Sequence, residues 1–146
     1  VACSETVRDY LVNRCSGLIY STALPPPVLG AMDAALDLLP SMDRERARVA
    51  TIASRFRDGA RTLGLDTGGS ATQIVPVILG TPEAALAMSG ELRRGGFWGA
   101  AIRPPTVPNG TARLRLAFTV AHEDSDIDRL LEIFEAQDAP RRATAH

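Results

Sequence analysis

The segment that most constrains the fold of this chain is residues 101–115, where prolines separate two apolar runs. Arg103 is followed by two prolines, and Pro108-Asn109-Gly110 comes shortly after them. Proline fixes φ and donates no backbone hydrogen bond, so a strand that reaches Arg103 must end there. Asn-Gly is typical of a turn, because glycine adopts positive φ at no steric cost. The segment therefore predicts a strand, a proline-containing loop and a returning strand.

The returning strand is predicted from the period-2 alternation of residues 114–120. One side carries Leu114, Leu116, Phe118 and Val120, and the other carries Arg113, Arg115, Ala117 and Thr119. The preceding strand is expected over 97–102, so Arg103 lies where a strand gives way to a rigid loop. A guanidinium held in one pose suits bidentate binding of a carboxylate or a phosphate. A surface arginine without a ligand fits the same spacing, and the pattern leaves both interpretations open.

The charge composition excludes some classes of partner. The formal net charge is −1, and no charge run is long enough to indicate a nucleic-acid or anionic-membrane partner. All 16 basic residues are arginine. Any reaction that needs a lysine amine therefore cannot be performed by this chain alone.

The cysteine content and the absence of a long apolar run indicate the compartment. Cys3 and Cys15 are too few for a disulfide framework, which favours a reducing, cytoplasmic location. There is no signal-peptide pattern and no apolar run of membrane-spanning length. The chain opens on valine instead of methionine, so we expect it to be a piece of a longer protein.

The element order predicts an α+β fold of helices layered on a small sheet. Helices are expected over 4–13, 25–39, 41–63, 81–94 and from 124 onward. A short extended or irregular segment is expected over 18–24, and strands over 72–79, 97–102 and 114–120. Pro76 within the first strand favours an edge position or a bulge. The apolar stripe that includes Met32 is predicted to pack in the core.

Few residues outside the proline loop are candidates for chemistry. No HExxH or CxxC spacing occurs, and no metal site is expected. His122 is a candidate general base, although satisfying the backbone groups at the start of the following helix is the favoured role. Cys15 has no evident catalytic partner. The arginines over 44–61 are interrupted by acidic residues and lack interleaved aromatics, so we interpret them as a solvated helix face.

Two stretches, residues 19–26 and 101–115, resemble the C-terminal part of the α-oxoamine synthases. These are pyridoxal-phosphate enzymes of the aspartate-aminotransferase fold type. Residues 3–7, 121–123 and 126–131 fit in the same order, so the resemblance covers almost the whole chain. Within the family, the Arg-Pro-Pro-Thr-Val-Pro run is similar to that of the 8-amino-7-oxononanoate synthases.

The resemblance implies the small C-terminal domain of a fold-type-I enzyme, with helices on one face of a small, mostly antiparallel sheet. Residues 1–39 would be the tail of the large cofactor-binding domain and the interdomain segment, and residues 40–146 the small domain. The parent would be a cytoplasmic homodimer that condenses a pimeloyl thioester with L-alanine in biotin biosynthesis, releasing carbon dioxide and the free thiol. Its cofactor would be pyridoxal 5′-phosphate. The acyl carrier stays open between coenzyme A and a carrier protein.

The resemblance also implies roles for four residues. Arg103 would bind the carboxylate of the amino-acid substrate, and Thr106 would line the same pocket. Thr22, together with Ser21, would bind the cofactor phosphate across the dimer interface. No catalytic residue is expected in this chain.

The family's Schiff-base lysine lies upstream of the segment that matches Val1, and this chain contains no lysine. We therefore expect the chain to be inactive by itself. One alternative is a non-catalytic binding or oligomerisation module of the same fold, and another is a sister α-oxoamine synthase that uses a different acyl-CoA. The presence of Arg103, Thr106 and Thr22 favours the C-terminal part of a synthase over a binding module. A module without substrate gains nothing from a carboxylate-binding arginine.

Overall fold

The computed structural model describes the backbone of residues 3–143 and the side chains of residues 3–137. The chain forms two compact units, Val1–Met42 and Asp43–His146. The predicted boundary at Leu39 lies slightly before this division, and the assignment of the first unit to the tail of a larger domain stays a prediction. No helix within the described residues is long and apolar enough to cross a membrane.

The first unit consists of helices. It contains α1 (Glu5–Arg14), α2 (Ser16–Ile19), α3 (Pro26–Leu38) and the 3₁₀ turn η1 (Leu39–Ser41). Ser4 caps α1, because its side chain accepts a hydrogen bond from the Val7 N–H. The predicted extended segment over 18–24 is wrong for its first two residues. The N–H groups of Leu18 and Ile19 donate to the Cys15 carbonyl, at 3.0 and 2.9 Å, and draw both residues into α2.

The apolar stripe of α3 does not pack in a core within this unit. Met32 is 53% exposed and Leu36 is 63% exposed. None of the described residues of α1, α2 or α3 is buried. The helical spacing of the stripe is as expected, but the prediction that Met32 packs in a core is wrong for this chain, because no element of the unit covers it.

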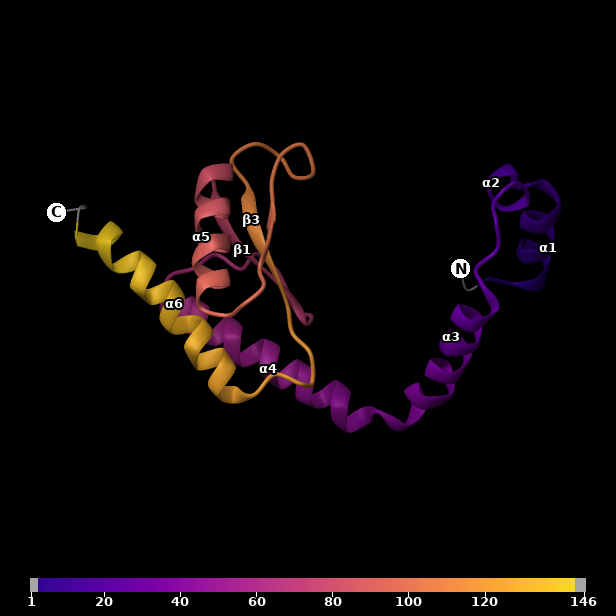
Figure 1. The fold of residues 1–146 in the computed structure, drawn as a ribbon, viewed down its shortest axis with the longest axis horizontal. Coiled ribbons are helices and arrows are strands. Elements are labelled where there is room, and N and C mark those ends of the chain that lie inside the picture. The colour runs from indigo at the N-terminus through magenta and orange to yellow at the C-terminus, as the bar shows by residue number, and fades with distance from the viewer. Residues whose placement is uncertain (1–2, 144–146) are drawn as a thin grey trace. The chain divides into compact units, whose positions relative to one another are not determined.

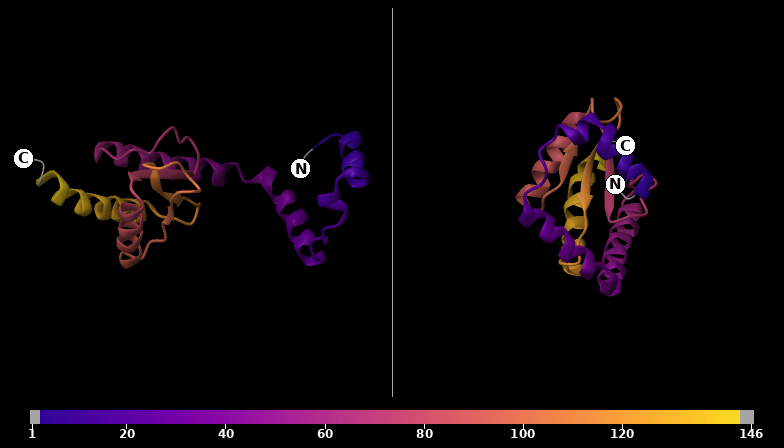
Figure 2. Two further views of the ribbon diagram at one scale, coloured as in Figure 1. Left: turned by 90° about the horizontal axis from the view of Figure 1, so that it is seen from above. Right: turned by 90° about the vertical axis from the view of Figure 1, so that its right-hand side faces the viewer.

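The second unit contains a three-stranded antiparallel sheet and three helices (Figures 1 and 2). In chain order its elements are α4 (Asp43–Thr62), β1 (Ile74–Gly80), α5 (Pro82–Arg94), β2 (Ala100–Ile102), β3 (Ala112–Ala117) and α6 (Asp124–Ala143). The strand order is β1-β3-β2, and Pro76 lies on the edge strand β1, as its missing N–H requires. Helix α5 packs against all three strands, whereas α4 packs against β1 and α6.

One face of the sheet and the facing helices form the core. Its largest fully buried side chains are Phe56, Ile52, Leu92, Leu114, Ile127, Val75 and Val77. Phe56 of α4 contacts the rings of Phe118 and Phe134, with centroids 5.2 and 6.0 Å apart. On β3 the alternate residues Arg115 and Ala117 are exposed, so the described helices of the second unit cover one face of its sheet.

Two strand predictions need correction. The strand expected over 97–102 begins only at Ala100, because the Phe97 N–H donates to the Leu92 carbonyl of α5 at 2.8 Å. The strand expected over 114–120 begins earlier, at Ala112, and ends at Ala117. Val120 is 47% exposed and lies beyond the sheet.

Candidate functional site

The loop that carries Arg103 begins where β2 ends at Ile102. The Thr106 N–H donates to the Arg103 carbonyl at 3.0 Å and closes a turn with two prolines at its centre. The Pro104–Pro105 peptide bond is cis. Arg103 and Thr106 are both exposed, so the structure brings these two predicted site residues together at the two ends of one turn.

The return of this loop to β3 is held by a chain of hydrogen bonds. The Thr111 N–H and hydroxyl both donate to the Pro108 carbonyl, at 3.2 and 2.7 Å. Gly110 has a φ of 77°, the positive value that the Asn-Gly turn predicts. Arg113 Nε then donates to the Thr111 carbonyl at 2.9 Å. This bracing role of Arg113 was not predicted, because the sequence shows only a polar residue in strand alternation.

The Arg103 guanidinium forms no hydrogen bond or ion pair with any of the side chains described, residues 3–137. Two arginines of α4 differ, because each has a partner. Arg61 pairs with Asp58 at 2.9 Å, and Arg57 donates to the Thr72 carbonyl at 2.8 Å. A free guanidinium on a proline-containing loop has all its donors available for a planar anion.

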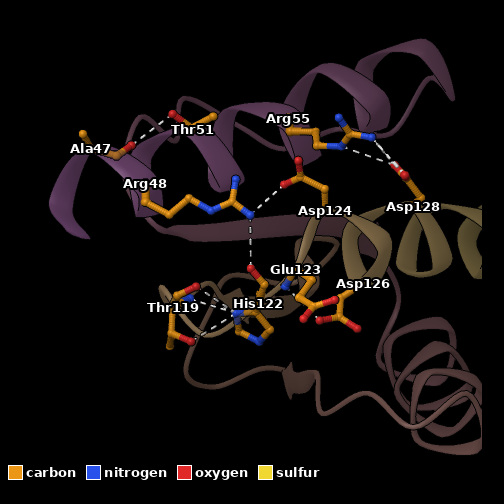
Figure 3. A network of polar contacts seen from close by, with 10 residues as sticks. All are labelled: Ala47, Arg48, Thr51, Arg55, Thr119, His122, Glu123, Asp124, Asp126 and Asp128. Carbon is orange, nitrogen blue, oxygen red and sulfur yellow. Dashed lines mark hydrogen bonds and ion pairs between the residues drawn. The ribbon is translucent and has the colours of Figure 1, made fainter. Parts of the chain in front are cut away.

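Two further α4 arginines join α4 to α6 (Figure 3). Arg55 binds both carboxylate oxygens of Asp128 through Nη2, at 2.7 and 2.9 Å. Hydrogen bonding to Asp128 and its negative charge raise the pKa of Arg55 above its ordinary value. Arg48 binds Asp124 at 2.8 Å. These arginines support the packing of the helices, and a phosphate-binding role is not needed to explain them.

His122 has a structural hydrogen bond. Its Nδ1 accepts the Thr119 N–H at 2.9 Å (Figure 3). Its ring also lies edge-on to Phe118, with centroids 6.1 Å apart. With Nδ1 occupied as an acceptor, Nε2 carries the proton in the neutral ring. The interaction is with Thr119, two residues beyond the end of β3, and it supports a structural role for this ring.

The other predicted pair, Ser21 and Thr22, lies in the first unit between α2 and α3. The Ser21 hydroxyl donates to the Leu18 carbonyl at 3.1 Å and keeps its lone pairs as acceptors. Both residues are exposed. Ser21 and Thr22 belong to the first unit, whereas Arg103 and Thr106 belong to the second. Within the described residues, no group of three or more His, Cys, Asp or Glu side chains could hold a metal ion.

A three-stranded antiparallel sheet covered by helices on one face is the architecture of the small C-terminal domain of fold-type-I pyridoxal-phosphate enzymes. A solved structure of SPT with its PLP internal aldimine superposes with a TM-score of 0.83 at 26% identity, covering 93% of this chain and 35% of that one. The family model of the class I and II aminotransferases matches residues 1–134. This chain belongs to the aminotransferase class I and II family.

Two curated relatives narrow the similarity within this family. One is the putative 8-amino-7-oxononanoate synthase of Paramagnetospirillum magneticum, 58% identical over 131 residues that cover 90% of this chain. The other is the 8-amino-7-oxononanoate synthase of Gluconacetobacter diazotrophicus, 56% identical over 135 residues that cover 92% of it. The chain spans 33% and 34% of the lengths of these relatives.

Proposed function

We propose that this chain is the C-terminal part of a pyridoxal-phosphate-dependent acyltransferase that condenses a pimeloyl thioester with L-alanine. The products are 8-amino-7-oxononanoate, carbon dioxide and the free thiol, in biotin biosynthesis. The observation that carries the proposal is the identity of 58% and 56% to relatives that bear this enzyme's name. The whole protein is proposed to be a cytoplasmic homodimer.

In this proposal Arg103 binds the alanine carboxylate. Its guanidinium is exposed and without an intramolecular partner among the described side chains, so binding a carboxylate costs no existing ion pair. The turn between Arg103 and Thr106 fixes the backbone from which both side chains project. Thr106 would line the alanine pocket, and its hydroxyl offers one donor and two acceptor sites for the substrate.

The fit of this chain to pyridoxal phosphate is incomplete. The hydroxyls of Ser21 and Thr22 are exposed and suit a phosphate oxygen, which accepts short hydrogen bonds. The cofactor aldehyde needs a lysine amine, and all 16 basic residues of this chain are arginine. The chain is therefore proposed to supply groups that bind substrate and cofactor phosphate, with the reacting groups on the part of the parent that these residues do not include.

The test of inactivity uses the 146-residue chain. Incubation with pyridoxal phosphate, borohydride reduction and peptide mapping should give no pyridoxyl adduct on any side chain. A stoichiometric side-chain adduct would contradict the proposal, since it would reveal a nucleophile other than lysine.

The test of the Arg103 role uses the whole protein. Replacing Arg103 by Ala should raise the KM for alanine by about 10–100-fold, because a hydrogen-bonded ion pair contributes roughly 1.5–3 kcal/mol. Cofactor affinity should not change. Arg44→Ala is the matched control, since it removes the same charge from an exposed position on α4. An unchanged KM for alanine in the Arg103 variant would remove this residue from its assigned role.

A further inference from the structure

An acidic or amide residue precedes glycine at two places in the chain, Asp58-Gly59 and Asn109-Gly110. In such a pair the glycine nitrogen can attack the side-chain carbonyl carbon of the preceding residue and close a five-membered succinimide ring. Glycine favours this reaction because it has no side chain to obstruct the approach. The ring closes only where the backbone lets that nitrogen turn toward the side chain. The local structure of the two pairs therefore decides which of them reacts.

The first pair is held in a helix. Asp58 and Gly59 lie within α4, where the N–H of each residue points along the axis toward the preceding turn. The Gly59 carbonyl accepts the Leu63 N–H at 3.1 Å, and the Asp58 carboxylate is paired with Arg61 at 2.9 Å. Bringing the Gly59 nitrogen to the Asp58 side chain would require this part of α4 to open. The structure therefore protects the first pair.

The second pair lies at the centre of the exposed turn from Pro108 to Thr111. Gly110 has a φ of 77° and Asn109 does not have a positive φ, so the turn is of type II, with an Asn109 ψ of about +120°. The turn is closed by the Thr111 N–H and hydroxyl, which both donate to the Pro108 carbonyl. Within the described residues, no group accepts the Gly110 N–H or binds the Asn109 carboxamide. Neither reacting group is engaged elsewhere.

The backbone of this turn can also reach the reactive conformation. The Gly110 nitrogen approaches Asn109 Cγ when the peptide plane between the two residues rotates about the Asn109 ψ. Glycine allows this rotation because it adopts either sign of φ, and no atom lies within 4 Å of an ideal Cβ at Gly110. Only the local turn has to open, and its backbone hydrogen bond of 3.2 Å is at the long end of the usual range.

We propose that Asn109 is a site of spontaneous deamidation in the folded protein. The Gly110 nitrogen, after losing its proton to a base in solution, forms a bond to Asn109 Cγ. The bond from Cγ to the side-chain nitrogen breaks, and this nitrogen takes up a proton from water and leaves as ammonia. Water then opens the succinimide at either carbonyl and gives aspartate or isoaspartate. The net change is the addition of water and the loss of ammonia, with no oxidant or reductant.

Asn13, the other asparagine of the chain, is expected to stay intact. It lies in α1, and its Nδ2 donates to the Asp9 carbonyl at 2.7 Å. The next residue, Arg14, is the last of α1 and carries a side chain that obstructs the attack of its nitrogen. Because ring closure there requires local unfolding of α1, its rate should be at least about tenfold lower than at Asn109.

Deamidation would change the loop that carries Arg103. Both products place a carboxylate in the segment between Arg103 and Thr111, and isoaspartate also lengthens its backbone by one carbon atom. The Arg103 guanidinium has no partner among the side chains of residues 3–137, so the new negative charge attracts it without breaking another ion pair. An anion that competes for Arg103 weakens binding of the alanine carboxylate. This consequence rests on the proposed function, whereas the deamidation itself does not.

The experiment incubates the 146-residue chain at neutral and mildly alkaline pH, digests it with trypsin and measures the peptide masses. Trypsin does not cut before proline, so Asn109 falls in the peptide of residues 95–113, which contains no other amide side chain. This peptide should exchange NH for O, faster at higher pH because the attacking nitrogen must lose its proton. The peptide that contains Asn13 should change at least about tenfold more slowly. An unchanged mass at Asn109, or equal rates at Asn109 and Asn13, would overturn the proposal.

Two controls separate the structure from the sequence. Asn109→Gln should leave the mass of the 95–113 peptide constant, because glutamine would have to form a larger ring. Asp58 should isomerise in urea, where α4 is unfolded, and not in the folded chain, as read from the chromatographic retention of its peptide. Isomerisation of Asp58 at the same rate in both states would contradict the protection by α4. Circular dichroism confirms that the chain stays folded during the incubation without urea.

The consequence for Arg103 is tested in the whole protein. Asn109→Asp should raise the KM for alanine by about 2–5-fold, the effect of one exposed charge pair, and Asn109→Gln should leave it unchanged. In an Arg103→Ala background the two Asn109 variants should have the same KM. Equal KM values with Arg103 present would exclude the competition for Arg103. If Arg103→Ala itself leaves the KM unchanged, the proposed role of Arg103 fails, and the mass measurement still decides the deamidation.

Discussion

Gly99 offers a sharp test of how tightly the sheet packs against α5. A Cβ atom at this position would lie 2.7 Å from Leu92 Cδ1 and 3.2 Å from Leu116 Cδ2. Leu92 is fully buried and Leu116 is 4% exposed, so neither side chain can move into solvent. The backbone φ of Gly99 is not positive, so alanine can adopt this backbone conformation without strain. The side-chain clash therefore decides how much stability the substitution costs.

Gly99→Ala should therefore destabilise the second unit by about 1–3 kcal/mol, the usual cost of inserting a methyl group into a well-packed core. For a domain of roughly 100 residues this corresponds to a fall in Tm of about 5–20 °C. The assay is thermal and urea unfolding followed by circular dichroism.

Gly90→Ala is the matched control. Gly90 lies within α5, and no neighbouring atom is within 4 Å of its ideal Cβ position. The same substitution should here stabilise the unit by about 0.5–1 kcal/mol, because alanine has the higher helix propensity.

The combination Leu92→Val with Gly99→Ala tests the mechanism of the clash. Shortening Leu92 removes the atom that meets the new methyl group. The double variant should therefore lose less unfolding free energy than the two single variants lose together, by at least about 0.5 kcal/mol. Simple additivity, or a Gly99→Ala variant as stable as the parent, would refute the packing argument.

Three further changes test other parts of the second unit. Thr81→Ala should cost about 1 kcal/mol in thermal unfolding, because the Thr81 side chain accepts the Ala84 N–H, whereas Thr81→Ser should retain most of that stability. Phe56→Ala should cost about 3–5 kcal/mol in urea unfolding, since this fully buried ring contacts two others; a smaller loss than for Phe56→Leu would contradict its central place. Asp128→Asn should destabilise slightly at low salt and less at about 0.5 M NaCl, because its pair with Arg55 is exposed and screened. An undiminished effect at high salt would indicate a role other than charge.

Local patterns predicted most of the second unit because its elements are stabilised by residues close in sequence. Thr81 and Pro82 mark the start of α5, and the alternation after Gly110 marks β3. The start of β2 was predicted too early. Phe97 fits a strand by propensity, but its N–H donates to the Leu92 carbonyl five residues earlier, in the turn with Gly96 at positive φ that ends α5.

For the candidate site, the sequence predicted the position of Arg103 but not its surroundings. The position of Arg103 at the end of a strand follows from its two prolines, and the structure places it there. That its guanidinium has no partner among the side chains of residues 3–137 was not predictable, because this depends on where the other charged side chains lie. The exposure of Met32 was not predictable for a similar reason. A helical apolar stripe predicts a buried face without specifying which segment covers it.

The edges of the sheet also bear on how this chain behaves at high concentration. An exposed strand edge can pair with another molecule and start an aggregate. On β1 this is opposed by Pro76, which has no N–H to donate, and by the bridge between Asp66 and Ile78. On the other edge β2 is only three residues long and runs directly into Pro104 and Pro105. Intermolecular sheet growth is blocked at both edges, so self-association of the isolated chain should proceed through the exposed apolar helices of the first unit.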